Sequence, residues 1–497
     1  MRANFNSTAI YYVISILVVL FSFFSFSYIA YPFFNSDAAL SVLMSYDYHF
    51  PADLYCWGQN RGGTAEMMIA HFFIGIFQSS PLINASIVHF LVLATGLLAS
   101  FHFVRKPLSR FALTIAWFFP SFFFIESILY QFGIQFSFFM MAMFFFSKAV
   151  HSEKRNSVLL SLAFVFMILN CWVLDLGFIP VIILLLFVAN HLTRSKQKSD
   201  LFSSGLRKLF RLRNLVISLL WIIAGICFIA FAKKNAAGFN AYHGYEVNNF
   251  SGVFSVVKAV LNSAKSILLF GGKPADIIYF YSAIGFLFFF GFYASGNKNT
   301  DRNFFRSFFL WQSLLSLLAL LLIKQVQLND VPSRYFSGCY LSFAIFILMK
   351  LDELQENIFL KIFLFTALGC SVFSSLYEIY FPKKLPPMVK DFQALNTYKP
   401  LGIIGSYWNS YVFSAIDPAQ IKATPHEGDN VRNIEVAHAT LAQPAILLIQ
   451  NEWLDQFPDS ITQFGTLLIK KGNPFSIGTY YSYDEENKVM ACEYSKK

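Results

Sequence analysis

Long apolar blocks dominate the sequence and recur from the N-terminus to about residue 377. Each block is roughly 17–24 residues long, which allows an α-helix to cross a hydrocarbon layer about 30 Å thick. A water-soluble helical bundle would instead show a polar face along every helix. The pattern therefore predicts eleven transmembrane helices, at residues 10–31, 82–104, 108–125, 130–147, 157–173, 177–193, 214–232, 277–294, 307–324, 335–350 and 359–377.

Lys and Arg are distributed unequally between the segments that join these blocks. With the N-terminus in the cytoplasm, the inner segments hold 19 of them and the outer loops hold 8. Because cytoplasmic loops are enriched in Lys and Arg, this orientation is favoured, and an odd number of spans then places the C-terminus outside. The most basic inner loop, 194–214, is expected to lie against anionic headgroups.

Two long outer loops are expected, at 32–81 and 233–276. Within the first, residues 64–78 are apolar but too short to span comfortably, which predicts a helix lying in the interface plane. The alternative is a short transmembrane helix, which would reverse the side of every later loop and oppose the charge distribution.

The tail, 378–497, has a different pattern, with more proline, more charge and shorter apolar runs. It predicts strands at 444–450, 466–471 and 476–483, and a helix at 433–442. We therefore predict a polytopic α-helical membrane domain of about eleven transmembrane helices at 1–377, followed by a small extracytoplasmic α/β domain at 378–497.

Composition supports a membrane protein and excludes some other classes. The chain is 56% hydrophobic and 13% charged, with 62 Phe, whereas soluble domains carry about 25% charged residues. The net charge of +10 comes from the short loops, so nucleic-acid binding is rejected. The six cysteines include no CxxC pair and indicate neither a zinc site nor a disulfide framework, although a Cys56–Cys492 bridge across the outer face is one alternative.

Ionisable residues at the outer membrane surface cost free energy, which makes them functional candidates. Asp37 lies alone among apolar residues just after the first span, where a partly desolvated carboxylate suits a general base. The alternative is that Asp37 caps the helix that follows it. Asp175 lies in the short outer turn before the sixth span, where capping of the next helix is again the alternative.

Two further outer segments carry donors. In residues 57–64, two glycines let the backbone pass close to another group while Gln59, Asn60 and Arg61 supply side-chain donors, and an ordinary tight turn is the alternative. Arg334 and Tyr335 open the tenth span. A guanidinium binds phosphate through two parallel hydrogen bonds, whereas an Arg/Tyr pair anchoring the interface is the alternative.

Taken in order, these residues resemble the pattern of the C-type glycosyltransferase (GT-C) superfamily, the integral membrane enzymes that include protein mannosyltransferases and aminoarabinose transferases. The resemblance rests on an acid in the first outer loop, a Gly-rich segment before an interfacial helix, an aromatic and an acid before a span with an early proline, an Arg-Tyr pair, and a Tyr-Trp segment opening the outer domain. The matching positions are Asp37, Cys56 to Gly63, Trp172, Asp175, Pro180, Arg334, Tyr335, Gly402 and Ser406 to Tyr411.

The resemblance implies an inverting transfer of a sugar from a polyprenyl-phosphate-linked donor to a glycan, lipid or protein acceptor, outside the cytoplasmic membrane of the cell. Asp37 would act as the general base. Arg334, Arg61 and Tyr335 would bind the donor phosphate. Sugar or acceptor contacts are expected from Gln59, Glu66, Asp175, Tyr407 and Trp408, with core packing as the alternative for the last two.

No cofactor is firmly expected from the sequence. Ala38 follows Asp37 where many GT-C members have a second acid, and no DxD motif occurs, so a divalent metal has no supporting motif. Two other classes stay open. A lipid or polysaccharide flippase would place charges at mid-membrane, and a non-catalytic subunit of a surface-glycan assembly machine would not need Asp37.

Overall fold

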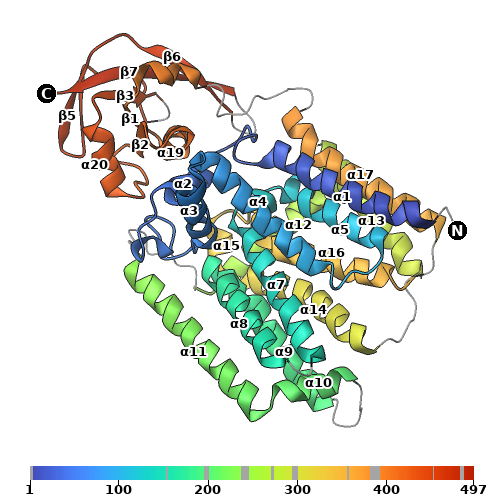
Figure 1. Ribbon diagram of the computed structural model, residues 1–497. Helices are drawn as coiled ribbons and strands as arrows, with labels where there is room; N and C mark the ends of the chain where they lie inside the picture. Colours follow the sequence, from blue (N-terminus) through green and yellow to red (C-terminus); the bar gives the residue numbers. More distant parts are fainter. Residues whose placement is uncertain are drawn as a thin grey trace. The chain divides into compact units, whose positions relative to one another are not determined.

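The structure is a computed structural model (Figure 1), and it describes residues 4–152, 155–194, 201–236, 246–269, 274–293, 300–354, 357–380, 392–450, 453–481 and 486–497. Contacts divide the chain into two compact units. Unit 1 comprises Met1–Ser22, Leu91–Ala230 and His243–Lys383, and unit 2 comprises Phe23–Phe90, Phe231–Tyr242 and Lys384–Lys497. The first outer loop therefore belongs to the same unit as the tail.

Unit 1 is a bundle of apolar helices (Figure 1). The pairs α7 and α8, α13 and α17, and α14 and α16 pack along one another. Three helices (α1, α4 and α11) run from unit 1 into unit 2. The helices that form or enter unit 1 are α1 (Asn4–Phe26), α4 (Pro81–Ser100), α5 (Pro107–Phe118), α6 (Glu126–Leu129), α7 (Gln131–His151), α8 (Asn156–Val173), α9 (Phe178–Arg194), α10 (Leu201–Leu209), α11 (Leu212–Asn235), α12 (Phe250–Leu268), α13 (Pro274–Tyr293), α14 (Thr300–Leu322), α15 (Lys324–Leu328), α16 (Ser337–Leu351) and α17 (Ile358–Tyr380), with the short 3₁₀ turns η2 (Phe122–Phe124), η3 (Asp175–Gly177) and η5 (Ser333–Phe336).

The predicted polytopic membrane architecture is confirmed. Among the described residues, nine helices are long and apolar enough to cross a membrane. A tenth span forms if α5 and the segment Phe122–Leu129, which are bent by 67°, count as one. The remaining predicted span, 277–294, is the apolar helix α13, of which Asp276–Phe288 counts as a shorter apolar helix. Every predicted span therefore contains a helix, although 108–125 is broken after Phe118, and nine or ten spans of the described residues can cross by length and composition.

The surface of α11 indicates contact with hydrocarbon. Leu219, Leu220 and Ile226 are 57%, 60% and 64% exposed, and only 11% of the apolar stretch of α11 is buried inside the structure. Water would make such a surface strongly unfavourable, whereas lipid chains cover it without cost.

Parts of two predicted loops form helices that the sequence did not predict. The described part of the outer loop 233–276 contains α12, and residues 237–245 and 270–273 lie outside the described residues. In the basic loop 194–214, residues 195–200 lie outside the described residues, and α10 buries Phe202, Leu206 and Leu209 on one face. Both helices are amphipathic. Their charged residues interrupt the apolar runs, so the sequence pattern did not predict a helix in either loop.

Unit 2 contains the predicted interfacial helix, α3 (Ala65–Phe77), which is confirmed as a helix of 13 residues and is too short to span. One face is buried at Met67 and Ala70, while Phe72 and Phe77 are 64% and 66% exposed. An apolar face left open in this way fits a helix lying in the headgroup region.

The tail forms a mixed seven-stranded sheet in the order β2-β1-β3-β7-β5-β4, with β6 paired to β7. The strands β1 to β3 are parallel, and the later pairings are antiparallel. The three predicted strands and the predicted helix are confirmed as β3, β5, β6 and α20, whereas α19 and four strands were not predicted. Their bounds are β1 (Leu401–Gly405), α19 (Tyr407–Ile416), β2 (Ile421–Pro425), α20 (Ile434–Ala442), β3 (Ala445–Ile449), β4 (Ser460–Gln463), β5 (Thr466–Lys470), β6 (Phe475–Tyr481) and β7 (Glu486–Lys496).

Within unit 2, helix α19 of the tail packs against α2 (Ser36–Tyr46) of the first outer loop, and α2 packs against α3. The α2 residues Ala39, Val42 and Met44 are fully buried. Burial of each of these side chains stabilises the folded unit by roughly 1–3 kcal/mol. The packing therefore fixes the first turn of α2, which carries Asp37, against the start of α19.

Candidate active site

Asp37 lies in the first turn of α2, but it does not cap that helix. Asn35 is the N-cap residue, and its Oδ1 accepts a hydrogen bond from the backbone N–H of Ala38 at 3.2 Å. The capping interpretation of Asp37 is therefore wrong. Because Asn35 satisfies the helix end, the carboxylate is available for other contacts, and its place in the first turn is favourable to a negative charge.

The phenol of Tyr407 donates a hydrogen bond to Asp37 Oδ1 at 2.5 Å, across a separation of 370 residues. Tyr407 begins α19 and is 3% exposed, and its backbone N–H donates to Asp429 Oδ2 at 2.7 Å. Burial and the neighbouring carboxylate both raise the pKa of Tyr407, so the phenol keeps its proton and acts as a donor. Packing alone does not explain this residue, because its polar end meets the candidate base.

Arg432 completes the chain of contacts and was not singled out from the sequence. Its Nε donates to the Tyr407 hydroxyl at 3.3 Å, and its guanidinium carbon lies 4.9 Å from the centroid of the Tyr407 ring. Burial lowers the pKa of Arg432, but the interactions with Tyr407 and Asp37 outweigh it and raise the pKa. The result is a line of three side chains, carboxylate, phenol and guanidinium, contributed by α2, α19 and the segment before α20.

The Gly-rich segment forms a turn beside Arg432. Gly58 and Gly62 have φ values of +69° and +72°, which glycine adopts without strain. A Cβ added at Gly58 would lie 3.1 Å from the backbone oxygen of Arg432, so the backbone does pass close to another group, as predicted. Arg61 Nε donates to Gln59 Oε1 at 3.0 Å. The turn is observed, whereas a donor role of Gln59, Asn60 and Arg61 toward a ligand stays a prediction.

A buried acid supports this turn from within. Asp53 is 6% exposed, and its Oδ1 accepts from the indole N–H of Trp57 at 2.9 Å, while Oδ2 accepts from the backbone N–H of His49 at 2.7 Å. Burial raises the pKa of Asp53, and the two hydrogen bonds oppose that effect. This carboxylate is committed to holding the loop.

Glu66 is also engaged inside unit 2. It is 5% exposed, and its Oε2 lies 2.8 Å from Nδ1 of His89, which in turn lies 3.1 Å from the hydroxyl of Tyr28. This buried group joins α3 to α4. A sugar contact at Glu66 stays a prediction, and the observed contacts describe a structural role.

Arg334 belongs to unit 1, at the η5 turn before α16. Its Nη1 lies 3.4 Å from Glu126 Oε1, and its guanidinium carbon lies 6.0 Å from the centroid of the Tyr130 ring. The side chains of Arg334 and Glu126 are 29% and 20% exposed, so a ligand can reach this pair. Tyr335 accepts a hydrogen bond from the Asn329 side chain at 2.9 Å.

The backbone before Arg334 is strained. Asp330 and Val331 have φ values of +56° and +55°, and a β-branched residue rarely adopts this left-handed region. Strain of this kind costs on the order of 1–3 kcal/mol per residue and is often found at functional sites. The strained turn sets the direction from which Arg334 enters the bundle.

Asp175 lies in η3, close in space to this region of unit 1. Its neighbour Leu176 packs against the same buried cluster as Val331, Tyr335 and Phe336. The turn itself is fixed by Asn170, whose amide donates to the carbonyl of Gly177 at 2.8 Å. Trp172, at 1% exposure, packs edge-on against a phenylalanine.

An apolar cavity of about 470 Å³ adjoins the strained turn, with Asp330 and Val331 in its lining. A second cavity of about 290 Å³ shares five lining residues with it and continues between α5, α13, α16 and α17. The shared residues are Phe124, Phe280, Ile284, Tyr340 and Phe343. Together the two cavities form an apolar groove that begins at the strained turn Asp330–Val331.

Three further expectations have outcomes in the structure. Trp408 is 54% exposed next to the buried Tyr407, so the two aromatics differ in environment. Cys56 and Cys492 are free thiols, so the disulfide alternative is wrong. In the described ranges, no three His, Cys, Asp or Glu side chains gather in a way that would hold a metal ion.

The chain was compared with known proteins. No protein-family model and no curated protein matches it. It is similar to ArnT from Cupriavidus metallidurans bound to undecaprenyl phosphate, at 10% identity over 99% of this chain and 98% of that chain, with a TM-score of 0.42. The apo form of ArnT gives 10% identity over 98% and 97% of the two chains, with a TM-score of 0.43.

It is also similar to the archaeal oligosaccharyltransferase AglB from Archaeoglobus fulgidus, in complex with an inhibitory peptide and a dolichol-phosphate. The identity is 12% over 88% of this chain and 69% of that chain, with a TM-score of 0.40. At this level of similarity, no role is transferred to any residue of this chain.

Proposed function

We propose that this chain is a membrane glycosyltransferase of the GT-C type, which moves a sugar from a polyprenyl-phosphate-linked donor to an acceptor on the outer side of the cytoplasmic membrane. The observation that carries the proposal is the contact of Asp37 with Tyr407 and, through it, with Arg432. This contact fixes the direction of the carboxylate, which a general base needs in order to reach the proton of its substrate.

Asp37 is the proposed general base. One of its oxygens, Oδ1, accepts from Tyr407, whereas no described residue donates a hydrogen bond to Oδ2. The anchored oxygen fixes the direction of the carboxylate, and the other oxygen takes the proton of the acceptor hydroxyl. That hydroxyl oxygen bonds to the anomeric carbon while the bond from this carbon to the phosphate oxygen breaks, which inverts the configuration.

Arg334 is the proposed ligand of the leaving phosphate. A guanidinium stabilises the negative charge that builds up on the phosphate as the bond breaks. Its present partner, Glu126, lies at 3.4 Å, a long contact that a phosphate dianion would displace. The apolar groove that begins at the strained turn before Arg334 suits the isoprenoid chain of the donor.

Arg334 and Asp37 are proposed to act on the same donor because both lie on the outer side in the orientation that the Lys and Arg distribution favours. Arg61 is proposed as a second ligand of the donor phosphate, and Gln59, Asp175 and the exposed Trp408 are proposed to contact the sugar or the acceptor. Tyr335 is proposed to support Arg334.

The test compares surface glycans by mass spectrometry in cells that lack the chain and in cells complemented with variants. The proposal expects a sugar to disappear on deletion and to return with the natural chain and with Asp47→Asn, an exposed acid at the other end of α2. It expects no return with Asp37→Asn at equal membrane expression. Full restoration by Asp37→Asn would contradict the enzyme and favour a non-catalytic subunit.

A further inference from the structure

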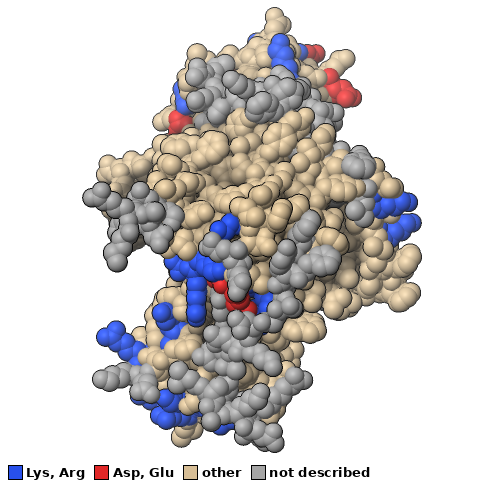
Figure 2. Space-filling view, turned by 90° about the vertical axis from the view of Figure 1, so that its right-hand side faces the viewer, with Lys and Arg blue, Asp and Glu red and all other residues tan. Residues whose placement is uncertain are grey.

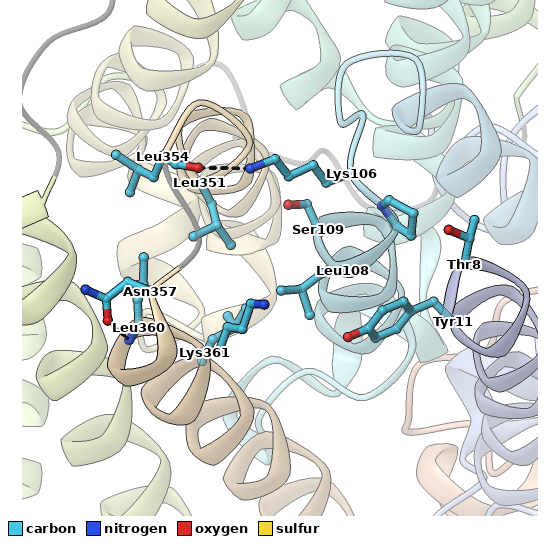
Figure 3. A pocket seen from close by; sticks show the side chains of 12 residues that line it. Thr8, Tyr11, Lys106, Leu108, Ser109, Leu351, Leu354, Asn357, Leu360 and Lys361 are labelled. Carbon is cyan, nitrogen blue, oxygen red and sulfur yellow. Dashed lines mark hydrogen bonds between the residues drawn. The ribbon is translucent and has the colours of Figure 1, made fainter. Parts of the chain in front are cut away.

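A cavity of about 280 Å³ in unit 1 lies between the ends of four helices, and the candidate active site does not use it (Figure 3). Its walls come from the N-terminal part of α1, the start of α5, the end of α16 and the start of α17. The lining residues are Thr8, Tyr11, Lys106, Pro107, Leu108, Ser109, Leu351, Leu354, Asn357, Leu360, Lys361 and Leu364. The sequence placed all four of these segments on the cytoplasmic side, and the structure brings them to one end of the bundle.

The polar part of the cavity is cationic. Lys106 and Lys361 both line it, and none of the twelve described lining residues is acidic. Lys106 Nζ donates to the carbonyl of Leu354 at 2.9 Å, which holds this ammonium group at the wall. Asp352, a buried acid at the end of α16, accepts hydrogen bonds from the backbone N–H groups of Arg105 and Lys106 at 2.6 and 3.1 Å.

The first turn of α5 lies at the same cavity. Its N-cap position is Lys106, whose side chain makes no capping hydrogen bond, and Pro107 follows as the first helical residue. The first N–H groups of a helix have no partner within the helix, and the helix dipole makes this end partly positive. By contrast, α17 is capped, because Asn357 Oδ1 accepts from the N–H of Phe359 at 2.8 Å.

The buried hydroxyl of Ser109 is a second, independent observation that points to a ligand in this cavity. It is 1% exposed, it lines the cavity, and its Oγ has no hydrogen-bond partner among the described residues. A buried hydroxyl without a partner costs roughly 1–3 kcal/mol, so natural proteins rarely leave one unsatisfied. In Figure 3, the Ser109 hydroxyl lies between Lys106 and Leu108 and faces the space across which Lys361 stands.

We propose that this cavity binds the phosphate group of a membrane lipid at the cytoplasmic headgroup level. Two ammonium groups and a buried hydroxyl without a described partner form a set of donors that matches phosphate oxygens. Basic pockets between transmembrane helices on the cytoplasmic side are typical sites for anionic headgroups. This proposal does not depend on the glycosyltransferase proposal, because its polar groups, those of Lys106, Ser109 and Lys361, take no part in it.

The apolar lining favours a lipid over a free phosphate ion. Leucines line the cavity beside the cationic groups, and Leu364 also lines the apolar groove between α5 and α17. An acyl chain leaving the headgroup would therefore pass directly onto hydrophobic surface. Figure 2 shows a wide face of the molecule without Lys, Arg, Asp or Glu, next to an area where Lys and Arg gather around a few acids.

The test is native mass spectrometry of the full chain in detergent, titrated separately with dioleoylphosphatidic acid, dioleoylphosphatidylcholine and inorganic phosphate. We expect phosphatidic acid to bind at least about tenfold more tightly than phosphatidylcholine. Lys361→Gln and Ser109→Ala should each weaken phosphatidic acid binding by about fivefold to tenfold, as the loss of one charged or neutral hydrogen bond to the phosphate implies. Lys148→Gln, a lysine on α7 that does not line the cavity, serves as the matched control and should bind as the natural chain does.

Equal binding in all four proteins, or no preference for the acidic lipid, would overturn the proposal. Competition by inorganic phosphate at the same concentrations as the lipid would identify a free ion as the ligand and overturn the lipid assignment. Ser109→Ala removes one oxygen atom and keeps the helix, so unchanged thermal unfolding of this variant ensures that weaker binding reports the site.

Discussion

The carboxylate of unit 2 and the guanidinium of unit 1 are held in opposite ways. Asp37 has a neutral hydrogen-bond donor, Tyr407, at 2.5 Å, and the positive charge of Arg432 stands behind that donor. Arg334 faces the opposite charge of Glu126 directly at 3.4 Å. Asp37 is thus held by a neutral donor and not by a direct ion pair, whereas Arg334 is held by a direct ion pair with a carboxylate.

This difference corresponds to what the two groups would do during transfer. A base must receive a proton, which a direct salt bridge to its oxygen would oppose. A phosphate ligand must bind an anion that arrives and leaves with each donor molecule, so a replaceable carboxylate keeps the empty site electrically balanced. Substitutions at each group distinguish a base held by a neutral hydrogen-bond donor from a cation held by an ion pair.

The largest effect is expected for the base itself. Asp37→Asn should lower kcat by about 10²–10⁴-fold, because the amide keeps the hydrogen bond from Tyr407 but takes no proton. The rate of glycan product formation in complemented cells or membranes measures this. A loss of less than about tenfold would mean that Asp37 is not the base, and Asp47→Asn should leave the rate unchanged.

The next largest effect is expected for the guanidinium of Arg334. Arg334→Gln should lower kcat/KM by roughly 10–150-fold, which corresponds to the loss of a charge-assisted contact of about 1.5–3 kcal/mol. Glu126→Gln should act in the opposite direction and lower the KM for the donor, because Arg334 no longer has to leave a carboxylate. If both variants lower kcat/KM equally, the pair is structural.

The contacts behind Asp37 should matter less than Asp37. Tyr407→Phe should lower kcat by about tenfold, since it removes one hydrogen bond that positions the carboxylate and leaves the ring packing intact. Arg432→Gln should show a similar loss and Arg432→Lys a partial recovery, because lysine restores the charge but not the planar contact. An unchanged kcat with a higher KM in these variants would contradict a positioning role.

The fit between the Gly-rich turn and Arg432 gives a smaller effect, on stability. Gly58→Ala should destabilise unit 2 by roughly 1–2 kcal/mol from the positive φ alone, and further because the new Cβ meets the Arg432 backbone. Gly465→Ala is the control, with a φ of +75° and open space around it. Equal losses in thermal unfolding would show that contact with Arg432 contributes nothing.

The smallest effect is a pH dependence in the tail domain. Burial against Trp453, with ring centroids 4.5 Å apart, lowers the pKa of His426, and Asp429 partly opposes this. The unfolded chain then binds this proton more readily than the folded chain, so stability falls as the pH drops below about 6.5 and levels off below the folded pKa. His426→Phe should flatten the profile of thermal unfolding, whereas the exposed His438→Gln should not.

Much of the fold was predictable from local pattern. Every predicted span is helical, because a run of apolar residues long enough to cross a bilayer leaves the backbone few other ways to satisfy its hydrogen bonds. The helices α10 and α12 were missed because their charges interrupt such runs. The strands β1 and β7 were missed because their pairing with β3 is decided by distant partners.

The candidate site was predictable in part for a similar reason. Asp37 and Arg334 stand out as ionisable residues bordering apolar runs, so the cost of placing them there is visible in the sequence. Arg432 lies in a polar tail segment where arginine is unremarkable, and its importance comes from a contact between segments far apart in the chain. The residue that caps α2 could not be predicted from spacing either. Asn35 and Asp37 both carry acceptor oxygens near the start of the helix, and only the structure shows that Asn35 is the cap.

The central claim is that the reacting acid and the phosphate ligand face the same side of the membrane. Single cysteines can be introduced as Trp408→Cys, Asp330→Cys and Lys361→Cys in a background without the native cysteines, and labelled in intact cells with a membrane-impermeant maleimide. The account predicts that positions 408 and 330 are labelled from outside, and that position 361 is labelled only after permeabilisation. Labelling of positions 408 and 330 from opposite faces would contradict a shared reaction centre.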